Sequence, residues 1–293
     1  MRIHLTSFAG SVMDELLKDV IQSFLCALQL LEQETTYAPA KLRQDVDFNV
    51  VLFCLEVDPQ VLLPMAGRCV LVNFEQLISS QRGSYTQLLS QHFVWEYSLA
   101  NISRFDRMGI ENFAYCPYGY VAGADSEVNF AERLPDADRD IDVFFYGAMR
   151  PRRRKLLDQM RQRGLRVVSN DGDFGFSNDF RDAQLRRAKL VLNVHAYDDS
   201  RIVEVVRLGQ LLRRRKAVLT ELYPDSELDP ALRSVVFGAP YELLADTAQL
   251  LLAAPGIREQ KELSGLDAFK SLDFAQSVRH ALQAYVQWRQ DRV

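Results

Sequence analysis

The chain has 293 residues, of which 48% are hydrophobic, and this length is sufficient for two domains with separate cores. Its net charge of −4 excludes the basic excess that is typical of general nucleic-acid-binding proteins. No apolar run approaches the length of a membrane span, and residues 1–10 lack a signal-peptide pattern, so we expect a cytoplasmic protein. The cysteines are widely spaced, which favours reduced, buried thiols: Cys26, Cys54, Cys69 and Cys116.

Short apolar runs alternate with helical patterns, and this alternation is typical of α/β layers with mostly parallel strands. The pattern predicts a first helix over 11–32 and a terminal helix over 271–293. The expected strands in the first half are 2–6, 48–55, 69–74, 92–97 and 113–116. Those in the second half are 142–146, 165–169, 190–195, 217–220 and 235–237. Residues 121–140 are acidic and poor in large apolar side chains, which predicts a linker.

Two strand-to-helix junctions in the second half predict a ligand site. Residues 190–221 are typical of a buried strand, a polar loop, a helix opening near Glu204 and a second strand. Residues 142–154 repeat this order, with a turn at Gly147 and clustered arginines at a helix start. Ligands of open α/β sheets bind at the carboxyl ends of strands, where helix N-termini supply donors for phosphate. We therefore expect a pocket for a nucleotide or a nucleotide sugar.

Several charged residues at these junctions are candidates for donor binding. Glu204 either contacts the ligand or only complements the helix dipole, and Arg207 either contacts phosphate or pairs with Glu204. Gly147 lets the backbone approach a diphosphate, although a plain turn explains it as well. Arginines suit phosphate because guanidinium binds it bidentately, and four are candidates: Arg150, Arg152, Arg153 and Arg201. A basic helix start opposes the helix dipole, so this cluster favours a bound anion.

The ends of predicted strands carry further candidates. Asn193 and His195 terminate the strand over 190–195, where either a structural or a ligand-binding role fits. Glu75 ends a strand of the first half and serves either as a general base or in a structural network. Four aromatic residues near strand ends fit the core better than a sugar-stacking role: Trp95, Tyr97, Tyr118 and Tyr120. Asp171 and Asp173 fit a turn better than a metal motif, and the four scattered histidines predict no structural metal.

The order and spacing of these segments resemble those of GT-B glycosyltransferases, and more closely those of bacterial group 1 glycosyltransferases. The resemblance spans most of the chain. It rests on six segments, namely VNFEQL (72–77), VWEYSLANISRFDRMGI (94–110), CPYGY (116–120), DVFFYGAMRPRR (142–153), RDAQLRRAKLVLNVH (181–195) and EVVRLGQLL (204–212). It implies two Rossmann-like domains facing a cleft, with an acceptor domain over 1–121 and a linker over 122–140. A nucleotide-sugar domain follows over 141–270, and helix 271–293 bridges the domains.

The resemblance also implies roles for particular residues. Glu204 matches the glutamate that holds the nucleotide ribose in many members of the family. The second glutamate of many retaining members falls at Ala196 here, so the stereochemical outcome does not carry over. Asp14 lies where some inverting members keep their base, although acids at helix starts are ordinary.

The resemblance therefore implies transfer of a sugar from a nucleotide-sugar donor to an acceptor hydroxyl in bacterial glycan synthesis. We expect no cofactor, no metal ion and no nucleic-acid partner. Two alternatives stay open, namely a non-catalytic binding protein of the same fold and a sugar-nucleotide epimerase. The sequence does not identify the sugar, the acceptor or the oligomeric state.

Overall fold

The computed structural model describes residues 1–10, 14–15, 17–55, 57–77, 83–124, 134–170 and 177–292. The chain forms two compact units. Unit 1 comprises Met1–Asp125 and Asp273–Val293, and unit 2 comprises Ser126–Leu272. The middle of the predicted linker lies outside the described residues, and its end contains the short 3₁₀ helix η2 (Asp136–Asp138).

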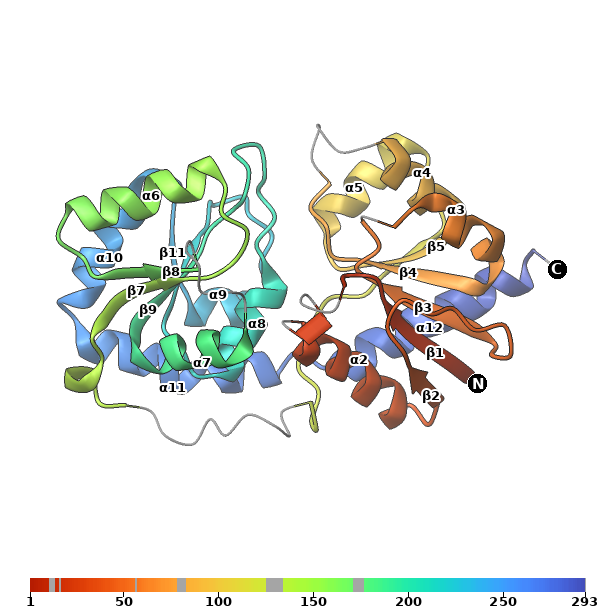
Figure 1. The fold of residues 1–293 in the computed structure, drawn as a ribbon, viewed down its shortest axis with the longest axis horizontal. Helices are drawn as coiled ribbons and strands as arrows, with labels where there is room; N and C mark the ends of the chain where they lie inside the picture. The colour runs from red at the N-terminus through yellow and green to blue at the C-terminus, as the bar shows by residue number, and fades with distance from the viewer. Residues whose placement is uncertain are drawn as a thin grey trace. The chain divides into compact units, whose positions relative to one another are not determined.

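Unit 1 contains a parallel six-stranded sheet with the order β2-β1-β3-β4-β5-β6. Its strands are β1 (Arg2–Ser7), β2 (Glu34–Tyr37), β3 (Phe48–Leu52), β4 (Cys69–Asn73), β5 (Phe93–Glu96) and β6 (Phe113–Tyr115). Every residue of β3, β4 and β5 is buried. This is the pattern expected where helices cover both faces of a parallel sheet, as they do here (Figure 1).

The helices of unit 1 are divided between the two faces of its sheet. Those on one face are α3 (Pro59–Leu62), η1 (Leu63–Arg68), α4 (Gly83–Gln91) and α5 (Leu99–Met108). They share a core with Val94 of β5, whose neighbours Phe93 and Trp95 point to the other face. There Trp95 stacks on Phe24 of α2 (Lys18–Leu30), and Phe93 contacts Tyr285 of α12 (Phe274–Gln290).

Unit 2 contains a parallel five-stranded sheet with the order β11-β10-β9-β7-β8. Its strands are β7 (Ile141–Phe145), β8 (Val167–Ser169), β9 (Ala188–Asn193), β10 (Val218–Glu221) and β11 (Phe237–Ala239). Helices α6 (Pro151–Gln162) and α10 (Leu244–Leu252) share one core with β7, β9 and β10. The remaining elements are α7 (Asn178–Arg187), α8 (Val205–Arg213), α9 (Pro230–Val235), η3 (Tyr241–Leu243) and α11 (Pro255–Lys270).

The order of the strands in unit 2 reverses beside β7, which lies between β8 and β9. At such a reversal the connections leave toward opposite faces, and this opens a crevice at the carboxyl ends of the two strands. The carboxyl ends of β7 and β9 therefore form the expected ligand-binding edge of unit 2. Of the site residues predicted for the second domain, Asn193 is the last residue of β9, and the others lie on the segments that follow β7 and β9.

The predicted fold class, an α/β fold with two Rossmann-like domains, is confirmed. All ten predicted strands are present, although their ends shift by one to three residues. The prediction missed β2, because its sequence ETTY is polar and it lies at the edge of the sheet with alternating exposure. The four cysteines are free and buried, as expected.

The terminal helix is α12, and its apolar stripe packs on unit 1. The Tyr285 ring lies 4.6 Å from the Phe48 ring, and its hydroxyl donates a hydrogen bond to the carbonyl of Gly67. Phe274, at the other end of the helix, lies 4.9 Å from Phe24. The predicted role of this helix as a bridge between the domains stays a prediction.

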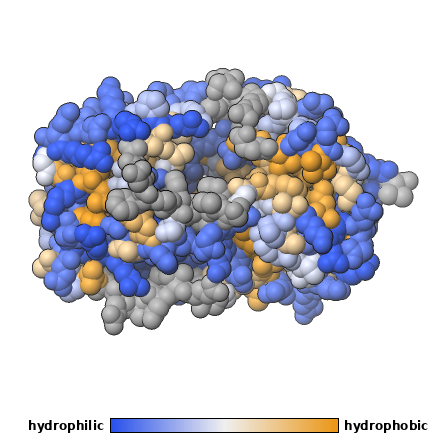
Figure 2. All heavy atoms as spheres, in the orientation of Figure 1, coloured by the Kyte–Doolittle hydropathy of each residue, from blue (hydrophilic) through white to orange (hydrophobic). Residues whose placement is uncertain are grey.

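On the face of each unit that Figure 2 shows, hydrophilic residues (blue) lie between groups of hydrophobic residues (orange). Within the described ranges, no helix is long and apolar enough to cross a bilayer.

Candidate functional site

The centre of the candidate site lies at the strand reversal of unit 2, where Gly147 and Arg207 meet. Gly147 follows β7 with φ +134°, and its N–H donates to the Asn170 side chain at 3.1 Å. A Cβ atom on Gly147 would lie 2.6 Å from Nη2 of Arg207. Arg207 Nη1 donates to the Asn193 side chain at 3.1 Å, and its guanidinium lies 5.7 Å from the Phe145 ring centre. The structure thus brings Gly147, Asn193 and Arg207 together at the reversal.

Arg153 joins the loop after β7 to the end of β9. Its side chain is 2% exposed, and it donates to the carbonyls of Ala148 and Val194, each at 2.8 Å. Burial lowers the pKa of Arg153 to about 10, and the nearby charge of Arg207 acts in the same direction. Its nearest acidic partner is Glu204, at 3.8 Å. Arg153 therefore has a structural role at the edge of the sheet, because its N–H groups donate to backbone carbonyls.

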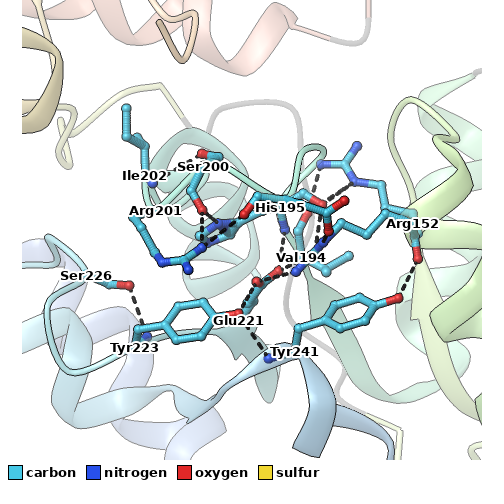
Figure 3. Close-up of polar contacts among 12 residues, drawn as sticks. Arg152, Val194, His195, Ser200, Arg201, Ile202, Glu221, Tyr223, Ser226 and Tyr241 are labelled. Carbon is cyan, nitrogen blue, oxygen red and sulfur yellow. Dashed lines mark hydrogen bonds and ion pairs between the residues drawn. The ribbon is translucent and has the colours of Figure 1, made fainter. Parts of the chain in front are cut away.

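Glu221, the last residue of β10, is fully buried and is the centre of a polar network (Figure 3). Arg152 donates to both of its carboxylate oxygens, at 2.6 and 2.7 Å. The Tyr223 hydroxyl donates at 2.9 Å, and the backbone N–H of His195 donates at 3.1 Å. Burial alone would raise the pKa of Glu221, but Arg152, His195 and Tyr223 outweigh it and lower that pKa. Sequence reasoning missed Glu221 because the predicted strand ended one residue before it.

His195 lies beside this network, under the loop that leads to α8. Its Nδ1 donates to the Ser200 carbonyl at 3.0 Å, and its buried Nε2 has no partner among the described residues. Burial lowers the pKa of His195. The exposed guanidinium of Arg201 lies 4.2 Å from the centre of the Tyr223 ring. His195 is therefore buried beside the Glu221 network, and Arg201 is exposed next to Tyr223 (Figure 3).

Glu204 occupies the N-cap position of α8, as the sequence predicts. Its side chain is 29% exposed, and one carboxylate oxygen lies 3.8 Å from a guanidinium nitrogen of Arg153. Arg207, one turn later, bonds Asn193 at the strand reversal. The first turn of α8 therefore carries both the Glu204 carboxylate and Arg207, the residue that bonds to the strand reversal.

Two arginines at the start of α6 have carboxylate partners within the protein, and the phosphate-binding role expected of one of the three stays a prediction. Arg152 pairs with Glu221 and with Asp198, and Arg153 lies near Glu204, so protein carboxylates offset these charges at the helix start. Arg150 differs, because it is exposed, donates a hydrogen bond to the Tyr197 hydroxyl and lies 5.6 Å from the centre of the Tyr197 ring. Of the three, Arg150 is the best placed to reach a ligand phosphate.

The candidate residues of unit 1 lie at the carboxyl edge of its own sheet. Asp14 accepts a hydrogen bond from Ser7, the last residue of β1. Glu75 follows β4, where its N–H donates to Asn73 at 2.9 Å and its carbonyl accepts from Asn101 at 2.8 Å. The side chains of Glu75 and Asp14 are both half-buried.

A further carboxylate in unit 1 is Glu96, at the end of β5. It bonds to the side-chain amides of Asn73 and Asn101, which also bond to the backbone of Glu75. Glu96 is fully buried and accepts from Asn73 and Asn101 side chains and from the Ser98 N–H. Burial raises the pKa of Glu96 to about 8, although these donors act against the shift. Sequence reasoning missed Glu96, and the available signal was a lone acid between Trp95 and Tyr97 in an apolar run.

The structure describes no group of three His, Cys, Asp or Glu residues that could hold a metal ion, within the ranges given above. Asp171 and Asp173 lie outside the described residues. The aromatic residues Trp95, Tyr97 and Tyr118 are buried, as predicted for core residues.

No protein family model matches the chain. Two uncharacterized proteins of Acanthamoeba polyphaga mimivirus are similar in sequence. One is 27% identical over 244 residues, which cover 79% of this chain and 26% of that protein. The other is 25% identical over 208 residues, which cover 70% of this chain and 66% of that protein. The chain thus spans about a quarter of the first relative and 66% of the second.

Three solved structures resemble the whole chain. One is an α-glucosyltransferase in complex with UDP and a 13-mer DNA, with a TM-score of 0.61, 7% identity and coverage of 98% and 99% of the two chains. Another is sucrose-phosphate synthase from Thermosynechococcus elongatus, with a TM-score of 0.58, 12% identity and coverage of 99% and 98%. The third is a DNA-modifying β-glucosyltransferase studied with UDP-glucose, with a TM-score of 0.57, 11% identity and 99% of each chain covered. The chain therefore has the two-domain fold of the GT-B glycosyltransferases.

Proposed function

We propose that the chain is a glycosyltransferase that binds a nucleotide-activated sugar at the carboxyl edge of unit 2. The observation that carries this proposal is the partly exposed Glu204 side chain, one helical turn from the cluster of Gly147, Asn193 and Arg207 at the strand reversal. A carboxylate can accept hydrogen bonds from two ribose hydroxyls, and an arginine at the adjacent crevice can pair with a diphosphate. The fold shared with UDP-dependent glucosyltransferases supports UDP as the first nucleotide to test.

In the proposed reaction, the bond between the anomeric carbon and the diphosphate oxygen breaks while the acceptor oxygen bonds to that carbon. The nucleoside diphosphate leaves with the electron pair of the broken bond. Arg207 and the exposed Arg150 stabilise the charge that develops on it, and such preorganised charges are a large catalytic contribution. The acceptor loses its hydroxyl proton to a carboxylate of unit 1, for which Glu75 is the first candidate and Asp14 the second. We propose that this reaction needs no metal ion.

The acceptor and the biological setting are open to test. The relatives found by sequence are viral and the fold neighbours include enzymes studied with DNA, so bacterial glycan synthesis is one candidate setting. The expectation that no nucleic acid is involved is tested by including DNA among the acceptors. A non-catalytic binding protein and a sugar-nucleotide epimerase are the other outcomes of the same test.

The test measures binding by calorimetry and turnover by product analysis. UDP, uridine and UDP-glucose are titrated into the full chain and into Glu204→Gln, with the exposed Glu259→Gln on α11 as a matched control. Loss of a charged hydrogen bond predicts an affinity for UDP about tenfold to a hundredfold lower in Glu204→Gln alone. Incubation with UDP-glucose, with and without EDTA, then distinguishes transfer or hydrolysis from epimerisation. Equal UDP binding by both variants and the parent would contradict the assignment of Glu204.

A further inference from the structure

The loop that joins β9 to α8 lies on the arginines at the start of α6, and we call residues 194–203 the β9–α8 loop. Tyr197 of this loop accepts a hydrogen bond from Nη2 of Arg150 at 3.3 Å. The next residue, Asp198, accepts a hydrogen bond from Nε of Arg152 at 2.6 Å. Because α6 follows β7 and the loop follows β9, these two contacts join the segments that leave the strand reversal.

The two carboxylate partners of Arg152 differ in their exposure to solvent. The side chain of Glu221 is fully buried and binds both Nη atoms, at 2.6 and 2.7 Å. The side chain of Asp198 is 89% exposed. An exposed ion pair is screened by water and contributes little, whereas the loss of one member of a buried pair is strongly destabilising. The contact of Arg152 with Asp198 is therefore exchangeable, and its contact with Glu221 is permanent.

A phosphate group and the Asp198 carboxylate offer Arg152 the same chemistry, because each presents a negatively charged oxygen to a guanidinium N–H. A diphosphate carries more negative charge and several such oxygens, so it binds the arginines at the start of α6 more strongly than one carboxylate does. A singly charged anion has no such advantage. Competition for Nε of Arg152 therefore favours a diphosphate over weaker anions.

The β9–α8 loop leads directly to Glu204, the residue assigned to the donor nucleotide. Within the loop, Arg201 donates to the carbonyl of Asp198 at 3.2 Å and to that of Ser200 at 3.0 Å. His195 Nδ1 donates to the same Ser200 carbonyl, also at 3.0 Å (Figure 3). Glu204 then occupies the N-cap position of α8. Release of Asp198 from α6 therefore alters the segment that positions Glu204.

We propose that Asp198 is an autoinhibitory and specificity-determining residue, which holds the β9–α8 loop on Arg152 until the diphosphate of the donor takes its place. The buried pair with Glu221 keeps the guanidinium in position during this exchange. An anion that binds no better than a carboxylate leaves the loop tethered. This inference rests on the proposed function, because it concerns the regulation of the same site.

The test measures binding of inorganic pyrophosphate, UDP and uridine to the full chain by calorimetry. Asp198→Asn keeps the size of the side chain and removes the competing charge. Asp225→Asn is the matched control, because it makes the same charge change at an exposed position after β10. Since an exposed ion pair contributes little, we expect Asp198→Asn to tighten binding of pyrophosphate and UDP about two- to fivefold. Uridine should bind all three chains equally, and Asp225→Asn should bind each ligand like the parent.

Hydrogen exchange in the β9–α8 loop gives a second readout, because it reports local opening. The loop of Asp198→Asn should exchange faster than that of the parent. Pyrophosphate should raise exchange in the parent but not in the variant, and acetate should raise it in neither. Equal exchange in the parent and Asp198→Asn would show that the contact does not hold the loop, and this would overturn the inference.

The binding data separate the inference from the proposed function. The inference is overturned if Asp198→Asn binds pyrophosphate no better than the parent, or if neither chain binds it. It is also overturned if Asp225→Asn gains as much affinity, since net charge alone would then explain the gain. UDP binding by the parent with no gain in Asp198→Asn refutes the inference and leaves the proposed function intact. A parent chain that binds pyrophosphate but gains nothing from the uridine part of UDP refutes the nucleotide donor instead.

Discussion

Gly147 and Arg207 are in such close contact that the smallest side chain on Gly147 would displace the arginine. The missing Cβ would lie 2.6 Å from Nη2 of Arg207, and Gly147 has φ +134°, which disfavours any side chain. Arg207 in turn bonds Asn193 and lies over the Phe145 and Tyr146 rings. The glycine after β7 thus determines where the guanidinium of α8 lies.

The first prediction is that Gly147→Ala lowers the affinity for UDP about tenfold and leaves the affinity for uridine unchanged, because Arg207 moves away from the diphosphate position. Calorimetry with the two ligands measures the difference. Gly164→Ala is the matched control, since Gly164 also has a positive φ of +81° but has no atom within 4 Å of the added Cβ. An equal loss for UDP and uridine would show that the change disturbs the fold and not the phosphate position.

The second prediction concerns the buried pair of Arg152 and Glu221. Arg152→Ala leaves the fully buried Glu221 without its main partner, and removal of one member of a buried pair costs about 3–5 kcal/mol. Urea unfolding is expected to show this loss, and Arg152→Ala combined with Glu221→Gln is expected to recover part of it. Arg187→Ala, which breaks an exposed pair with Asp140, is the control and should change stability little. A fully stable Arg152→Ala variant would refute the structural role assigned to this arginine.

The third prediction follows from the buried Glu96. Its pKa is raised by burial from 4.5 to about 8, so the folded chain holds this proton more tightly than the unfolded chain. The stability contributed by protonated Glu96 is complete below pH 4.5 and is lost as the pH rises toward 8. Between pH 5.5 and 7.5 the loss amounts to about 2.5 kcal/mol.

The matching measurement compares urea unfolding of the parent and Glu96→Gln at both pH values. His4 and His195 act in the opposite sense, because burial lowers the pKa of each, but both chains share them. The difference between the chains therefore isolates Glu96. Parallel pH dependence of the two chains would show that Glu96 is ionised throughout this range.

The sequence was sufficient to predict the centres of the sheets because their central strands are buried, which leaves continuous apolar runs such as 48–52 and 69–73. It also placed Glu204 at a helix start, since a polar loop between a strand and a helix is visible in the sequence. The edge strand over 34–37 lacks this signal, because one face is exposed and its residues are polar.

Pairing between distant residues could not be predicted. Arg152 and Glu221 are 69 positions apart, and only the fold shows that they bond each other. The Phe24 and Trp95 rings stack in the same way although they lie on different elements, α2 and β5, that are distant in the sequence. Residue types at strand ends therefore predict where a site lies, whereas the contacts that define it depend on the topology of the sheet.

The fourth prediction is that α12 is necessary for the stability of unit 1. Tyr285 is 1% exposed, lies between the Phe48 and Phe93 rings, and donates to Gly67. Tyr285→Ala leaves a cavity among these rings, and replacement of a large buried aromatic residue by alanine costs about 3–5 kcal/mol. Urea unfolding of this variant measures the loss.

Gln283→Ala on the exposed side of the same helix is the control, because it changes helix composition without opening the core. Truncation after Leu272 removes all of α12 and is expected to destabilise unit 1 more than Tyr285→Ala, since the contacts of Phe274 with Phe24 and Tyr118 are lost as well. Hydrogen exchange can assign the effect, because protection should fall in β3 and β5, which pack on this helix, more than in the strands of unit 2. If the truncated chain keeps full protection in β3 and β5, the terminal helix contributes nothing to the core of unit 1.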